Sequence, residues 1–361
     1  GHCIRFTEVA RYVRARAPCP AKGGPLTDAD SPGAIQMQQP KARPSMGRWY
    51  ILILISLMYL ITYLDRVNIS TAAPAISKEF GFDKITMGVI FSAFGWAYAL
   101  FQVPGGWIGD RFGPRRVLTV IVGYWSVMTA ATAFATGAGS FVVLRFLFGV
   151  GEGGAFPGAT RAMQLWYPKH ERGFVQGITH SASRLGAAIA PPVVVLIMTT
   201  LGWRSVFYIC GVVGLVWSIL WYVIYRNLPE DHALVNAEEL KTIRGADAQG
   251  NALKPNVSKK PAVPWGVMLR SLNMWSIMCA YFTYVYCLWI FLSWLPSYLI
   301  EFRHFTLIKV GIFASLPLWA GVVGDTVGGL ATDWLLAKTG SIKFARRSVA
   351  ITGMLGCALF L

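Results

Sequence analysis

Long apolar runs constrain this chain more than any other feature of its sequence. Several stretches of about twenty residues carry few or no charged side chains, the length that a helix needs to cross a hydrocarbon core of roughly 30 Å. Lipid cannot hydrogen-bond free backbone groups, so such stretches form helices or the strands of a closed barrel. These runs are too long and too continuously apolar for barrel strands. The sequence therefore predicts an all-α membrane protein, and its 14% of charged residues agrees with that class.

The apolar runs divide the chain into helices and connecting segments. We expect helices over about 49–70, 85–108, 116–136, 140–163, 172–199, 204–225, 270–298 and 308–332, with a ninth that begins near 347. The expected organisation is a disordered or non-native N-terminal extension (1–47), a six-helix bundle (48–226), a cytoplasmic central loop (227–264) and an incomplete second bundle (265–361). A second bundle as large as the first would need about four more helices. We therefore expect a C-terminally truncated two-bundle fold with about eight to nine of twelve transmembrane helices present.

The net charge of +16 indicates topology rather than a nucleic-acid partner. Eight Lys and Arg residues precede the first expected helix, sixteen lie in alternate loops, and only five lie in the opposite loops. Cytoplasmic loops of membrane proteins carry such an excess of Lys and Arg. The N-terminus and the central loop are therefore expected in the cytoplasm.

Nothing in the sequence indicates an enzyme, a cofactor or a metal site. The cysteines lie in apolar helices or in the N-terminal extension and form no CxxC pair. Gly149–Gly154 formally satisfies G-x-G-x-x-G, but no strand precedes it, and small residues at this spacing let membrane helices approach closely. The loops contain no nucleophile–base pair and no phosphate-binding loop.

An internal repeat relates the two parts of the chain. Gly-Gly-x-x-x-Asp stands at the end of the second expected helix (Gly105 to Asp110) and again at the end of the eighth (Gly328 to Asp333), each time followed by a basic turn. Two related bundles about an axis along the membrane normal are a known transporter plan. The repeat therefore predicts a transporter of two related bundles.

The repeat motif resembles the signature of the major facilitator superfamily between its second and third helices. The matching residues are Gly106, Asp110, Arg111, Gly113, Arg115 and Arg116. Three further segments resemble the anion:cation symporter family of that superfamily: Tyr63–Asn68, Arg145–Glu152 and Trp294–Tyr298. The resemblance covers about 48–361, and it implies coupled uptake of an organic anion and protons, often with a sugar acid as the anion.

Asp65 and Arg66 are charges inside the first expected helix. Asp65 lies sixteen residues past Trp49, about 24 Å along a helix, and charges at such depth usually face partners or water along a transport pathway. Arg suits forked recognition of a carboxylate, so Arg66 is the candidate substrate clamp and Asp65 a candidate proton-coupling site. The alternative is a local ion pair or an interfacial anchor. The family resemblance implies the same two roles.

Glu152 and Arg145 form a second buried charged set. They are seven residues apart and therefore lie on nearly the same face of one helix. They either neutralise each other or couple the gain and loss of a proton to transport, and the matched family positions imply proton coupling.

Several polar residues are candidates for further substrate contact. Tyr63 shares a helix face with Arg66, and Tyr98 shares one with Gln102; ordinary interhelical hydrogen bonding is the alternative for Gln102. The resemblance places Tyr63 and Tyr98 at the sugar-acid site, and Tyr284 is a candidate from the second bundle.

Arg184 lies in the middle of the fifth expected helix. We expect either a second carboxylate clamp, suited to a sugar diacid, or a pairing with Asp65 or Glu152 across the bundle.

The charges at cytoplasmic helix ends are candidates for a gate rather than for the substrate site. Asp110, Arg111, Arg115 and Arg116 can pair across the bundles in one state and separate in another, and Asp333 is their counterpart in the repeat. Asp325 has no assigned role.

Together these features predict a monomeric, proton-coupled symporter of the bacterial inner membrane. Its expected partners are protons, the lipid bilayer and a small organic anion such as glucarate, galactonate or a hexuronate. An aromatic carboxylate or a hydroxy-dicarboxylate is the alternative substrate, and a non-transporting membrane sensor is the alternative function.

Overall fold

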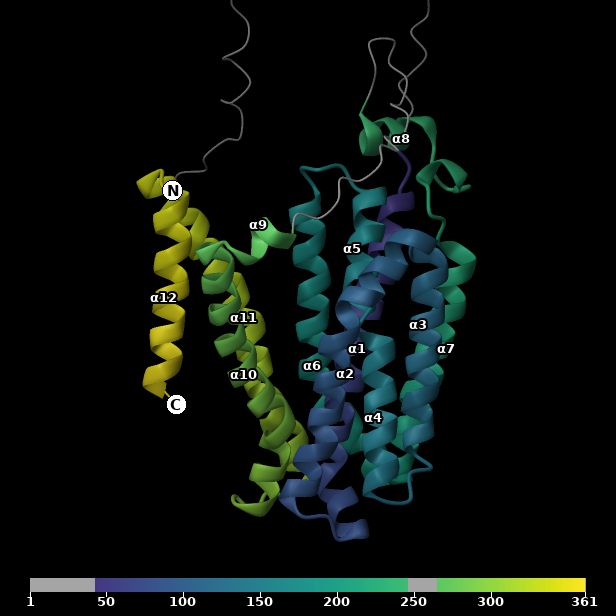
Figure 1. Ribbon diagram of the computed structural model, residues 1–361, viewed down its shortest axis with the longest axis vertical. Coiled ribbons are helices and arrows are strands. Elements are labelled where there is room, and N and C mark those ends of the chain that lie inside the picture. Colours follow the sequence, from purple (N-terminus) through teal and green to yellow (C-terminus); the bar gives the residue numbers. More distant parts are fainter. Residues whose placement is uncertain (1–42, 246–264, 361) are drawn as a thin grey trace, which may run out of the picture. The chain divides into compact units, whose positions relative to one another are not determined.

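The computed structural model describes residues 43–245 and 265–360, which belong to one compact unit (Figure 1). The first bundle consists of α1 (Gly47–Phe80), α2 (Lys84–Phe112), α3 (Pro114–Thr132), α4 (Ala138–Glu152), α5 (Ala155–Trp166), α6 (Arg172–Leu201) and α7 (Trp203–Ile224). The second bundle consists of α10 (Leu272–Glu301), α11 (Leu307–Thr339) and α12 (Ile342–Phe360). Between the bundles lie η2 (Pro229–Asp231), α8 (Ala237–Arg244) and α9 (Trp265–Leu269).

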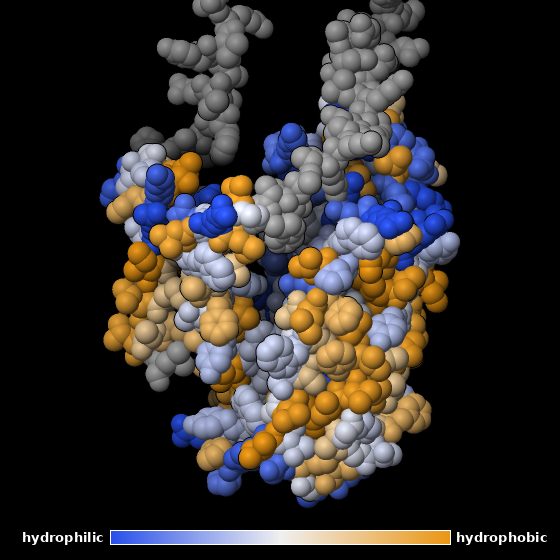
Figure 2. Space-filling model, viewed as in Figure 1, coloured by the Kyte–Doolittle hydropathy of each residue, from blue (hydrophilic) through white to orange (hydrophobic). Residues whose placement is uncertain are grey.

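Membrane-spanning character follows the apolar runs. Within the described residues, seven helical segments are long and apolar enough to cross a membrane: α1, α2, α4 with α5, α6, α7, α10 and α11. Figure 2 shows hydrophobic residues along the sides of the molecule and hydrophilic residues gathered at its ends, most densely at the end where α8 lies. This distribution is that of a multi-pass membrane protein.

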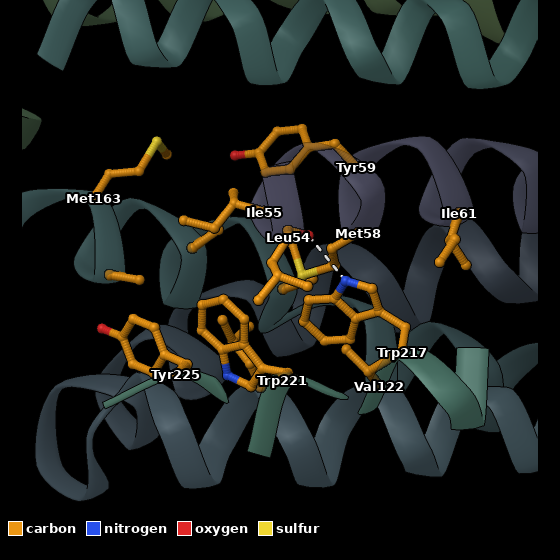
Figure 3. Packing of buried hydrophobic residues seen from close by; sticks show 14 of the residues in the cluster. Leu54, Ile55, Met58, Tyr59, Ile61, Val122, Met163, Trp217, Trp221 and Tyr225 are labelled. Carbon is orange, nitrogen blue, oxygen red and sulfur yellow. Dashed lines mark hydrogen bonds between the residues drawn. The ribbon is translucent and has the colours of Figure 1, made fainter. Parts of the chain in front are cut away.

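The helices of the first bundle pack in pairs around an aromatic core. α1 lies along α6, α3 lies along α7, and α2 lies against α4. Trp217, Trp221 and Tyr225 stack in a row along the end of α7 and face α1 (Figure 3). The Trp217 indole donates a hydrogen bond to the carbonyl of Leu54, 2.8 Å away. Ring packing and the hydrogen bond of this buried indole therefore hold α7 against α1.

The two bundles meet most extensively along two helix pairs. α10 packs against α1, and α11 packs against α6. α1 therefore contacts both bundles, and any side chain in its middle can face the space between them. Figure 2 shows a hollow between the bundles on one face of the molecule.

The span expected at 140–163 is broken in the middle. α4 ends at Glu152, and α5 starts at Ala155 after Gly153 and Gly154. Pro157 has no N–H for the carbonyl four residues before it, and that missing bond favours the break. A Cβ added to Gly105 of α2 would lie 2.5 Å from the Gly154 Cα, so the two backbones touch at the break.

The beginning of the central segment is folded against the first bundle. Glu239 of α8 is fully buried and accepts hydrogen bonds from the backbone N–H groups of Gly47 (3.0 Å) and Arg48 (2.9 Å) and from the Ser45 hydroxyl. α1 has no capping side chain and no acidic residue in its own first turn. Glu239 therefore supplies the N-terminal cap of α1. The rest of the expected central loop, residues 246–264, and residues 1–42 of the expected extension lie outside the described residues.

Candidate functional site

The centre of the candidate site is an ion pair between α1 and the end of α4. The Arg66 Nε donates to both carboxylate oxygens of Glu152, at 2.9 and 3.0 Å, and both side chains are buried. Sequence spacing suggested Arg145 as the partner of Glu152, but the hydrogen bonds come from Arg66. Arg145 and Glu152 do lie on one unbroken helix, α4, but the Arg145 guanidinium lies over the rings of Phe148 and Phe207.

Five aromatic rings surround the Arg66 guanidinium. Its Cζ lies 4.5 Å from the ring centre of Tyr98, 4.9 Å from Tyr63, 5.3 Å from Phe156, 5.6 Å from Phe94 and 5.9 Å from Trp289. Four of these rings belong to the first bundle, and Trp289 comes from α10. The rings stabilise the cation without neutralising it, and the carboxylate of Glu152 balances its charge.

Asp65 and Arg145 lie behind Arg66, inside the first bundle. Asp65 is 0% exposed and lies beside the indole of Trp125 and the thiol of Cys210. Arg145 is 2% exposed, and its guanidinium lies over Phe148 (5.0 Å) and Phe207 (5.7 Å). Together with Arg66 and Glu152, these residues make a buried set of two cations and two carboxylates.

A second polar group extends the site onto α10. The Arg184 guanidinium, on α6, donates a hydrogen bond to the hydroxyl of Tyr284. Tyr281, one turn before Tyr284, lies within electrostatic range of Tyr63, Tyr98 and Arg66. The structure therefore brings Tyr284 and Arg184 together, as two of the candidate substrate residues.

Gln102 lies one turn beyond Tyr98 on α2 and is half-buried. Its backbone lies against Gly153, at the break between α4 and α5.

The candidate gate residues of the basic turn have partners inside the first bundle. Asp110 pairs with Arg161 of α5, with Nε and Oδ1 3.5 Å apart. Arg111 packs over the ring of Trp107, at 5.4 Å from its centre. Arg115 donates to the carbonyl of Tyr222 at 2.8 Å.

Arg116 is exposed at the start of α3. The side chains of Asp333 and Asp325 lie outside what the structure describes.

Sequence reasoning missed three residues of these groups. Trp289 and Tyr281 are ordinary aromatic residues of an apolar run, and nothing in their spacing distinguishes them from lipid-facing rings. Arg161 carried a signal that could have been used, because a cation inside an expected span needs a partner.

A metal is not part of this arrangement. Over the described residues, no cluster of three or more His, Cys, Asp or Glu side chains could hold an ion.

The fold and the site together define a class of protein. Two helical bundles that share a buried, ring-enclosed charge pair at their contact are the architecture of a helical secondary transporter. The family model described as Major Facilitator Superfamily matches residues 55–361, and the chain belongs to that family. The expected all-α, two-bundle fold and the expected non-enzymatic class are thereby confirmed.

Curated relatives agree with this membership. The chain is 46% identical over 316 residues to the "Probable sulfoacetate transporter SauU" of Cupriavidus necator, a match that covers 87% of this chain and 71% of the relative. It is 34% identical to the "Probable galactarate/D-glucarate transporter GudP" of Escherichia coli, covering 86% of this chain and 71% of the relative. It is 35% identical to the "D-galactonate transporter" of Escherichia coli, with coverage of 87% and 74%.

Solved structures support the same fold. A bacterial homologue of the human lysosomal transporter Spinster, in an inward-facing and occupied conformation, matches with a TM-score of 0.63 at 19% identity. That match covers 80% of this chain and 62% of the solved chain. At this identity the likeness concerns the fold alone.

Proposed function

We propose that this protein imports a small organic anion together with protons across the bacterial inner membrane. The observation that carries the proposal is the Arg66 guanidinium, which is bound to Glu152 and enclosed by rings from both bundles. Curated relatives named as transporters or probable transporters of sulfoacetate, galactarate or glucarate, and galactonate support an anionic cargo. The excess of basic residues in the N-terminal segment and alternate loops supports a cytoplasmic N-terminus.

In this proposal, Glu152 and the substrate anion compete for Arg66, and this competition couples proton movement to substrate transport. A proton on Glu152 removes the negative charge that neutralises Arg66, and the anionic group of the substrate then takes its place. Release of the substrate inside the cell lets Glu152 lose its proton and bind Arg66 again. Asp65 and Arg145, buried behind the pair, keep the local charge balanced as the proton moves.

The arrangement of the bundles fits the inward-facing half of such a cycle. The end of α10 closes on the start of α2, through Lys84 and Glu301 (Nζ to Oε2, 3.0 Å) and through an edge contact of Phe91 with Trp294 (ring centres 5.5 Å apart). In the proposed topology this is the outer side. Opening this contact and closing the opposite side would carry the site from one face of the membrane to the other.

Sugar acids and short sulfonated acids are the two substrate classes to compare. The relatives named for galactarate or glucarate favour a sugar acid, with Tyr63, Tyr98, Gln102, Tyr284 and Arg184 as hydroxyl or carboxylate contacts. The 46% identical relative named for sulfoacetate favours a short acid.

The test is uptake of radiolabelled D-glucarate and sulfoacetate in proteoliposomes containing the full gene product. We expect at least one of them to accumulate only with an inwardly directed proton gradient, and Arg66→Ala to abolish this uptake. If neither accumulates in a protein that elutes as a single folded species, aromatic carboxylates are tested next. Uptake that survives Arg66→Ala contradicts the role of the cation.

A further inference from the structure

A small cavity lies next to Arg66 on the side facing the closed end of α2 and α10. Its volume is about 20 Å³, which is room for little more than one water molecule or one compact end group. Its lining comes from α1, α2, α4 and α10: Arg66, Ile69, Ser70, Phe91, Phe94, Arg145, Phe148, Trp289 and Ser293. The cavity is therefore formed by both bundles and would come apart whenever they separate.

The charged residues that line this cavity are both cationic. The residues that line it include two arginines, Arg66 and Arg145, and no Asp or Glu, although Asp65 and Glu152 lie within electrostatic range of Arg145. Among the described residues, Arg145 Nε and Nη2 and Arg66 Nη2 are buried without a hydrogen-bond partner. A buried donor without a partner is costly, and most of all when it is charged. The wall is therefore suited to a bare anionic group.

The remaining wall limits what can enter with that group. Ile69, Phe91, Phe94 and Phe148 offer no hydrogen-bond partner to a hydroxyl, and the Ser70 hydroxyl already donates to the Val67 carbonyl. Few groups of the wall can therefore replace the water around a polyhydroxylated carbon. The Ser293 hydroxyl, from α10, stands among these apolar side chains. The cavity wall therefore suits a sulfonate or carboxylate end group better than the hydroxylated middle of a sugar acid.

We propose that this cavity is a second anion subsite, which binds one end of a short dianion. The other end is bound by Arg66 together with the tyrosines beside it, Tyr63 and Tyr98. This inference rests on the proposed function and narrows its substrate class to compact acids with two anionic groups, such as a two-carbon acid carrying a sulfonate and a carboxylate. In this assignment Arg145 is a substrate-binding residue, in addition to its place beside Asp65 and Glu152.

The test is competition against uptake of labelled sulfoacetate by proteoliposomes containing the full gene product. Unlabelled sulfoacetate carries both anionic groups, whereas acetate and methanesulfonate each carry only one. We expect the dianion to compete at least tenfold better than either monoanion. Equal competition by all three would overturn the subsite while leaving anion transport in place.

The matched variants are Ser293→Val, which fills the cavity from α10, and Ser92→Val, which makes the same change at an exposed position of α2. We expect Ser293→Val to raise the apparent KM for sulfoacetate at least tenfold and to leave competition by acetate within twofold. We expect no effect of Ser92→Val. Both are small substitutions that leave the buried charges in place, so both variants are expected to fold.

Two outcomes count against the subsite in different ways. A Ser293→Val variant with unchanged preference for the dianion would place the second anionic group elsewhere, with Arg184 as the remaining cation. Thermal stabilisation of the wild type by chloride that Ser293→Val abolishes, without competition from sulfoacetate, would assign the cavity to an inorganic ion. Absence of any anion uptake by the folded wild type would instead reject the proposed function itself.

Discussion

At the scale of single residues, Arg66 is the cation for which Glu152 and the substrate compete in the proposed cycle. Arg66 is bound to Glu152 through its Nε, and rings rather than further carboxylates surround the rest of its guanidinium. Buried charge pairs are worth little for stability relative to apolar residues, but breaking one is costly. A pair of this kind is therefore suited to exchange of partners, in which the charge on Arg66 is neutralised at every stage.

Glu152→Gln should separate substrate binding from coupling. The amide cannot release a proton, so it cannot compete with the substrate for Arg66 in a proton-dependent way. We expect gradient-driven accumulation to fall at least tenfold while exchange of labelled for unlabelled substrate, which needs no net proton movement, continues. Accumulation and exchange are measured in the same proteoliposomes. Accumulation that still follows the proton gradient would mean that Asp65 or another group carries the proton.

The sequence predicted the buried charges but not their pairing. Asp65, Arg66, Arg145 and Glu152 stand out because charges are rare in apolar runs. Their partners depend on how α1 crosses α4, and this does not follow from residue spacing within one helix.

At the scale of elements, the central segment is part of the first bundle. Glu239 caps α1 from α8, and the Asn236 side chain caps α8 itself by accepting from the Glu239 N–H at 2.9 Å. Sequence reasoning treated this region as a polar loop, because charged residues dominate it and an eight-residue helix is too short to give a clear periodic pattern. The apolar runs did predict the long helices, although α1 extends to Phe80, ten residues past its expected end.

Glu239→Gln should destabilise the protein more than Glu238→Gln. The first change weakens a buried charged cap, worth about 1–2 kcal/mol, whereas Glu238 pairs only with Lys241 at a partly exposed position. We expect a lower apparent Tm for the first variant and an unchanged one for the second. Thermal unfolding in detergent, followed by circular dichroism, measures both. Equal Tm values for the two variants would contradict the capping of α1 by Glu239.

The contact of Glu230 with Arg244 should make the docking of α8 depend on pH. Burial alone would raise the pKa of Glu230, but the hydrogen bonds from Arg244 (2.8 and 3.0 Å) outweigh it and hold that pKa below its usual range. The ionised carboxylate therefore stabilises the folded state at neutral pH, and this contribution is lost as the pH falls through the lowered pKa.

Glu230→Gln is accordingly expected to lower stability at pH 7, by up to about 1 kcal/mol for a partly exposed pair. The difference from the wild type should shrink below about pH 4. Thermal unfolding of both proteins at several pH values between these limits provides the measurement. A difference that stays constant with pH would show that the ion pair is not its cause.

At the scale of the whole molecule, one end of the interface between the bundles is closed by a ring contact and an exposed ion pair. Lys84 and Glu301 are largely exposed, so their pair contributes little. The contact of Phe91 with Trp294 is the stronger of the two, because aromatic pairs add about 0.5–1.5 kcal/mol beyond their burial. The arrangement of the bundles was predictable from the repeat and the basic turns, but this contact was not, since it joins residues about two hundred positions apart.

Trp294→Ala should shift the molecule toward the state that is open at this end. Loss of the ring contact changes the ratio of the two states by about two- to tenfold. Spin labels at Ile85 and Arg303, both exposed near the contact, report the separation of α2 and α10 there. We expect a larger fraction of long distances in the variant. An unchanged distance distribution would show that other contacts hold the bundles together.

The cap on α1 also has a consequence for the order in which the protein is made. Glu239 follows Gly47 by 192 residues, so the ribosome completes α1 and the whole of the first bundle before the residue that caps α1 exists. Until then the first N–H groups of α1 lack the carboxylate that caps them. The cap forms only when α8 has been synthesised and packs against the start of α1. A first bundle produced alone would accordingly need to continue through Arg244. If it stopped at the end of α7, α1 would lack its N-terminal cap.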